Sequence, residues 1–127
     1  MNKLLVVDDD LHLRLMIEAI LESEGYSVVL AKSGPEALAI MKEEQPSLAL
    51  LDYMMPGMSG LDVLKEMKKS HGQTKVIMVT GHGNEKLSIE MLKSGASDYI
   101  QKPFTMDQLL SSVKRVLSVR IEDDKNQ

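Results

Sequence analysis

Five short runs of apolar residues, each about as long as a β-strand, recur along the chain. They occupy residues 4–7, 27–30, 48–51, 76–79 and 98–100. The first, third and fourth runs are almost continuously hydrophobic, which is typical of parallel strands covered by helices on both faces of their sheet. We therefore predict one strand at each run.

Between these runs, apolar residues recur at helical spacing. The first stripe is formed by Leu13, Met16, Ile17, Ile20 and Leu21. Its spacings of three and four indicate a helix with one buried face, and Gly25 follows where a helix C-cap belongs. A second helix is predicted to begin at Ser33, because Glu36 lies three residues later, as in a capping box, and Pro35 favours the first turn.

Three further helices are predicted on similar grounds. One extends over residues 59–69 with Ser59 as its cap, one extends over residues 84–94 and is ended by Gly95, and one begins near Thr105. Strands and helices thus alternate five times, which predicts a single doubly wound α/β domain with a parallel sheet and right-handed crossovers. Sites in such sheets lie at the carboxyl ends of the strands.

The composition narrows the range of functions. The chain has 127 residues, no cysteine and a net charge of -4, so disulfides and thiolate metal sites are excluded and direct binding to nucleic acid is disfavoured. No apolar run approaches the roughly 20 residues that span a membrane. We expect a cytoplasmic domain over residues 1–119. The polar tail at 120–127 is either a frayed terminus or the start of a linker to an output domain.

Polar residues capable of chemistry follow four of the five predicted strands. They are Asp8, Asp9 and Asp10 after the first strand, Asp52 after the third, Thr80 after the fourth and Lys102 shortly after the fifth. Since the carboxyl ends of parallel strands meet at one edge of the sheet, these groups are expected to converge. Asp10 is expected to cap the helix that follows it.

Such a cluster of carboxylates suits a hard cation. Like charges at close range raise the pKa of a carboxyl group, and Mg²⁺ relieves that repulsion by binding one or two carboxylates. The metal and Lys102 could then neutralise a phosphoryl group, whose transfer depends mainly on positioning and charge neutralisation. An aspartate can act as the nucleophile and form an acyl phosphate.

Five segments, in order and correctly spaced, resemble the receiver domains of bacterial two-component response regulators. These segments are LLVVDDD at 4–10, LLDYMMPGMSG at 50–60, VTGH at 79–82, GASDY at 95–99 and KPF at 102–104. The resemblance covers nearly the whole chain. It implies a flavodoxin-like, five-stranded parallel sheet of order 2-1-3-4-5 with helices on both faces.

The resemblance also implies a role for each residue at the strand ends. Asp52 is expected to be the phosphoacceptor. Asp9 and Asp52, with the main-chain carbonyl of Met54, are expected to bind Mg²⁺ directly, while Asp8 reaches the metal through water. Mg²⁺ is the implied cofactor.

Three further residues complete the implied site. Thr80 is expected to turn its hydroxyl toward the phosphoryl oxygen, and Lys102 to pair with the phosphoryl group. Tyr99 is expected to couple its rotamer to Thr80 as part of a switch. The bond before Pro103 is expected to be cis, which costs little only for proline. His82, two residues after Thr80, is a hypothetical regulator of phosphoryl lifetime.

The implied partner is a sensor histidine kinase or a histidine phosphotransfer protein. Phosphorylation is expected to shift the face formed by the fourth helix, fifth strand and fifth helix, and so to control an output domain or partner. Hydrolysis of the aspartyl phosphate ends the signal. The same face is the expected surface for a homodimer, with Ile89 as a candidate contact. The domain is thus expected to be a signalling module rather than an enzyme, although it catalyses its own phosphorylation and dephosphorylation.

Three alternatives remain open. A haloacid-dehalogenase-like phosphohydrolase would use an Asp-x-Asp pair such as Asp8 and Asp10, but the hydroxyl residue of that pattern is missing. A flavodoxin-like or nucleotide-binding module would need a loop that holds phosphates, and neither GxGxxG nor a P-loop occurs. A receiver-like docking module that is not phosphorylated is disfavoured because every acidic, hydroxyl and lysine position is intact.

Overall fold

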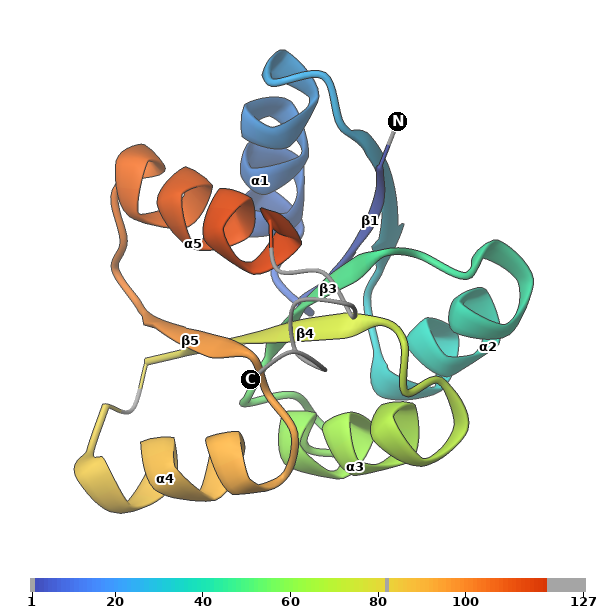
Figure 1. Cartoon of the computed structure of the whole chain (residues 1–127), viewed down its shortest axis with the longest axis vertical. Coiled ribbons are helices and arrows are strands. Elements are labelled where there is room, and N and C mark those ends of the chain that lie inside the picture. Colours follow the sequence, from blue (N-terminus) through green and yellow to red (C-terminus); the bar gives the residue numbers. More distant parts are fainter. Residues whose placement is uncertain (1, 82, 119–127) are drawn as a thin grey trace.

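The computed structural model describes residues 2–81 and 83–118, which form one parallel sheet covered by helices on both faces (Figure 1). Five strands alternate with five helices, and the strand order is β2-β1-β3-β4-β5. This confirms the predicted doubly wound α/β fold and its order 2-1-3-4-5. The predicted boundary at residue 119, the tail at 120–127 and His82 lie outside the described residues.

Each predicted strand is present and is slightly longer than its apolar run. The strands are β1 (Lys3–Val7), β2 (Ser27–Ala31), β3 (Leu48–Asp52), β4 (Lys75–Thr80) and β5 (Asp98–Gln101). Asp52 and Thr80 are therefore the last residues of their strands, not the first residues after them. The sequence predicted loop positions because polar side chains end an apolar run, whereas backbone pairing continues through them. Asp52 pairs with Val79, and Thr80 pairs with Gln101.

The helices are α1 (Leu11–Ser23), α2 (Gly34–Glu44), α3 (Gly60–Ser70), α4 (Glu85–Lys93) and α5 (Met106–Ser118). Each of them begins at a side chain that accepts backbone N–H groups; these caps are Asp10, Ser33, Ser59, Asn84 and Thr105. Asp10 accepts from His12 and Leu13, which confirms its predicted role.

One detail of the predicted capping is wrong. Glu36 does not complete a capping box with Ser33; its carboxylate instead accepts the backbone N–H of Lys32, one residue earlier. A reciprocal box occurs at the start of α5, where Thr105 and Gln108 each accept the other's backbone N–H. The Thr-x-x-Gln spacing was the available sequence signal.

The sheet separates two apolar layers, and alternate residues of each strand point into opposite ones. In β1, Leu4 and Val6 belong to the core under α1 and α5, while Leu5 and Val7 belong to the core under α2, α3 and α4 (Figure 1). Such burial on both faces explains why the inner strands are continuously hydrophobic. It also leaves the ends of the strands as the place where polar groups can gather.

Within the described part of the chain, no helix combines the length and apolar character required to cross a membrane.

Candidate functional site

Three carboxylates meet at the carboxyl edge of the sheet. One side-chain oxygen from each of Asp8, Asp9 and Asp52 lies within 4.8 Å of the other two. The register of the strands brings these carboxylates together. Val7 of β1 pairs with Leu51 of β3, and Asp8 and Asp52 directly follow these two residues in the chain. Asp8 is 2% exposed and Asp52 3% exposed, while Asp9 lies at the surface. We call this group the acidic pocket.

The backbone around the acidic pocket is held by several hydrogen bonds. Asp8 donates its N–H to the carbonyl of Ala31 in β2 over 3.1 Å, and Asp10 donates its N–H to Asp8 Oδ1 over 2.9 Å. Arg14 of α1 donates from Nη1 to the carbonyl oxygen of Asp8 over 2.7 Å. The start of α1 is thereby tied to the end of β1.

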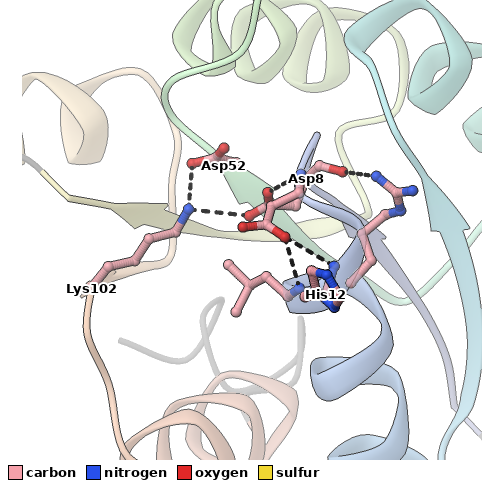
Figure 2. Close-up of polar contacts among 7 residues, drawn as sticks. Asp8, His12, Asp52 and Lys102 are labelled. Atoms are coloured by element: carbon pink, nitrogen blue, oxygen red, sulfur yellow. Dashed lines mark hydrogen bonds and ion pairs between the residues drawn. The ribbon is translucent and has the colours of Figure 1, made fainter.

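Lys102 bridges two of the carboxylates, as Figure 2 shows. Its Nζ lies 3.2 Å from Asp8 Oδ2 and 3.1 Å from Asp52 Oδ1. The backbone N–H of Lys102 bonds the carbonyl of Thr80 over 2.7 Å, so the residue directly after β5 is anchored to the end of β4. The bond to Pro103 is cis, as predicted.

Burial and charge together make Asp52 reluctant to ionise. Burial, and then the negative charge of Asp8, raise the pKa of Asp52 to about 6, although Lys102 and the N–H of Met54 act in the opposite direction. For Lys102, burial acts to lower the pKa, but Asp52 and Asp8 outweigh it and the net shift is upward. The lysine therefore stays charged beside the two acids.

The two predicted switch residues lie on the same face of the sheet but in different surroundings. Thr80 is buried at the end of β4. Tyr99 of β5 pairs with Met78, two positions before Thr80, and alternation places Tyr99 and Thr80 on one face. The Tyr99 side chain is 37% exposed, at the surface of the molecule.

The donor set of the acidic pocket fits a hard divalent cation. The clustered side chains offer only carboxylate oxygens, which suit Mg²⁺ better than metals that prefer nitrogen or sulfur. Met54, the other predicted ligand, directs its backbone N–H to the carboxylate of Asp52. The geometry thus brings Asp8, Asp9, Asp52 and Lys102 together as predicted.

Sequence reasoning missed Arg14. Its contact with the carbonyl of Asp8 depends on the direction in which α1 leaves the sheet. The available signal was its position four residues after the capping Asp10, one turn along the same helical face.

Comparisons with known proteins agree with this geometry. The sequence model of the response regulator receiver domain matches residues 4–114. The chain is 42% identical over 117 residues to the transcriptional regulatory protein CpxR of Klebsiella pneumoniae, covering 92% of this chain and 50% of that protein. It therefore spans about half the length of CpxR. It is also 36% identical over 118 residues to the chemotaxis protein CheY of Bacillus subtilis, covering 92% of this chain and 98% of CheY.

A solved structure supports the same relationship. The CheY-like receiver domain protein of Methanospirillum hungatei superposes with a TM-score of 0.90 at 36% identity, covering 100% of this chain and 99% of the other. The sheet order, the acidic pocket and these matches together show that the chain belongs to the response regulator receiver domain family.

Proposed function

We propose that Asp52 accepts a phosphoryl group from the phosphohistidine of a sensor histidine kinase or histidine phosphotransfer protein in the cytoplasm. One observation carries the proposal. The buried carboxylate of Asp52 shares an acidic pocket with Asp8 and Asp9 and lies 3.1 Å from the ammonium group of Lys102. A buried nucleophile beside cation ligands and a fixed positive charge suits phosphoryl transfer.

In the proposed reaction, an oxygen of Asp52 attacks phosphorus while the bond from phosphorus to the donor's imidazole nitrogen breaks. The products are an acyl phosphate on Asp52 and a neutral histidine on the donor, whose released imidazole nitrogen takes a proton from solvent. Lys102 exchanges its contact with the Asp52 carboxylate for one with a phosphoryl oxygen. Thr80 donates a hydrogen bond from its hydroxyl group to another phosphoryl oxygen.

The residues that would hold Mg²⁺ are Asp9, Asp52 and the main-chain carbonyl of Met54, with Asp8 acting through water. When bound, the metal supplies positive charge that offsets the charge on the phosphoryl oxygens. Before phosphorylation, the ammonium group of Lys102 offsets part of the negative charge of the pocket, because it pairs with Asp8 and Asp52.

Signal output follows from the change at Thr80. Its movement toward the phosphoryl group would favour an inward rotamer of Tyr99, and so a second arrangement of the face formed by α4, β5 and α5. That face would then control an output domain or a separate partner. Attack of water on phosphorus breaks the bond to Asp52, releases phosphate and ends the signal.

Incubation with acetyl phosphate and Mg²⁺, followed by intact mass measurement, tests the proposal. The unmodified protein should gain the mass of one phosphoryl group, and Asp52→Asn should gain none. Asp62→Asn, which changes an exposed carboxylate on α3, is the matched control and should be phosphorylated normally. An unmodified protein that gains no mass would overturn the proposal and favour a docking module.

A further inference from the structure

We infer that Arg14 is a positioning residue that sets the affinity of the acidic pocket for a divalent cation. The inference rests on the proposed function, since it concerns the same pocket. Arg14 lies in the first turns of α1 and is half-buried. Its guanidinium reaches back to the carbonyl oxygen of Asp8, the residue that follows β1.

The contact acts on the peptide unit that joins Asp8 to Asp9. Arg14 Nη1 donates to the carbonyl oxygen of Asp8 over 2.7 Å, the short distance of a charge-assisted hydrogen bond. The carbonyl of Asp8 and the N–H of Asp9 belong to one planar unit. Holding that carbonyl therefore fixes the direction in which the chain enters Asp9.

Asp9 depends on this backbone more than its neighbours do. Asp8 is buried, and its carboxylate bonds both Lys102 and the N–H of Asp10. Asp52 is buried within β3 and bonds Lys102. The Asp9 side chain is exposed, so packing does not hold it, and its place in the pocket follows from the orientation of its backbone.

Because Arg14 is positively charged, the direction in which its removal changes cation affinity distinguishes two possible roles. If Arg14 affected a cation only through space, its removal would reduce repulsion and the cation would bind more tightly. If Arg14 positions the Asp8–Asp9 peptide, its removal would weaken binding instead. Loss of a residue that orients metal ligands typically weakens binding about 10- to 100-fold.

The experiment measures Mn²⁺ binding by electron paramagnetic resonance in the unphosphorylated protein. Arg14→Met should bind Mn²⁺ about 10-fold more weakly than the unmodified protein, as expected for lost support of a metal ligand. Arg14→Lys, which keeps the charge and one donor, should recover part of that loss. Arg115→Met is the matched control, because it removes an arginine that bonds Asp98 on β5 and makes the same change in net charge.

The outcomes separate this inference from the proposed function. Normal Mn²⁺ binding by the unmodified protein, with equal or tighter binding by Arg14→Met, would overturn the role of Arg14 alone. Absence of binding by the unmodified protein would overturn both. Circular dichroism without metal checks that the variants are folded. If Arg14→Met does not fold, Arg14→Gln replaces it as the variant without a positive charge.

Discussion

Asp52 occupies a position that disfavours its own charged form. In the metal-free protein its pKa is raised from 3.8 to about 6, chiefly by burial and then by the charge of Asp8. Between these two values the folded protein binds more protons at Asp52 than the unfolded chain does. The contribution of Asp52 to the free energy of unfolding therefore falls as pH rises from about 4 to about 6, and the full penalty remains at higher pH.

Asp52→Asn should remove this penalty. Without metal, the variant should be more stable than the unmodified protein at pH 8 by roughly 1–3 kcal/mol, since each pKa unit corresponds to about 1.4 kcal/mol. The difference should shrink toward pH 4, where Asp52 is protonated in the folded protein and partly protonated in the unfolded chain. Urea unfolding at pH 4, 6 and 8 measures it.

Asp62→Asn is again the control, because that carboxyl is exposed on α3 and its loss should change stability little. A gain for Asp52→Asn that is the same at every pH would mean that ionisation of Asp52 is not its cause.

The residues of the acidic pocket were largely predictable from sequence, because each of them stands at the end of an apolar run. Asp8, Asp9 and Asp52 end buried strands, and parallel strands end at a common edge. Arg14 was not predictable in the same way, because its guanidinium acts on a backbone carbonyl and not on a side chain. The outward position of Tyr99 also depends on packing that no spacing reveals.

At the scale of the elements, α3 begins directly against the end of β3. The N–H of Gly60 bonds the carbonyl of Tyr53 over 2.8 Å. A Cβ atom at Gly60 would clash with the carbonyl oxygen of Asp52 and lie 2.7 Å from Cα of Tyr53. These are backbone atoms and cannot swing aside, so only glycine allows α3 to approach β3 this closely.

Gly60→Ala should therefore be costly, with a loss of roughly 1–3 kcal/mol or more in the free energy of unfolding, as for other overpacked sites. Urea unfolding measures the loss. Gly72→Ala is the matched control: its nearest contact would be 3.4 Å, to the carbonyl oxygen of Lys68, and it should be tolerated. Similar stability of the two variants would show that the β3–α3 connection can relax.

The existence and order of the elements followed from periodicity, whereas their ends depended on pairing and caps. Apolar runs located all five strands, yet β3 and β4 continue one residue further, through Asp52 and Thr80. Backbone hydrogen bonds continue where hydrophobicity stops. The hydrogen bond from the backbone N–H of Lys32 to the Glu36 carboxylate likewise depends on the side-chain conformation of Glu36, which the sequence pattern does not reveal.

At the scale of the whole molecule, the face of α4, β5 and α5 carries exposed apolar side chains. Ile89 is 44% exposed and Leu92 47% exposed on α4, and Tyr99 is 37% exposed on β5. Isolated apolar residues are common on surfaces, but these lie on the face expected to respond to phosphorylation. We propose that this face mediates self-association of the active form.

Beryllofluoride with Mg²⁺, which mimics the phosphoryl group, should then promote dimers in sedimentation velocity experiments. Ile89→Glu should reduce this association because it places a charge in the apolar contact. Leu15→Glu, an equally exposed apolar residue on α1, should leave it intact. A profile that beryllofluoride does not change would contradict dimerisation through this face.

The fold and family of the whole molecule were predictable because alternating strands and helices allow few arrangements, and because five separate segments share one pattern. The order of the elements and the five segments do not determine which output the domain controls. The chain is similar both to the transcriptional regulatory protein CpxR and to the chemotaxis protein CheY, and it covers about half of CpxR and nearly all of CheY.

Phosphorylation of Asp52 is tested directly by locating the phosphoryl group in the chain. After reaction with acetyl phosphate and Mg²⁺, borohydride reduces an aspartyl phosphate to homoserine, which tandem mass spectrometry of peptides can place. Asp52 and no other aspartate should be converted, and Asp52→Asn should contain no homoserine. Conversion of Asp8 or Asp9 instead, or of no residue in a protein that binds Mn²⁺, would contradict phosphorylation of Asp52.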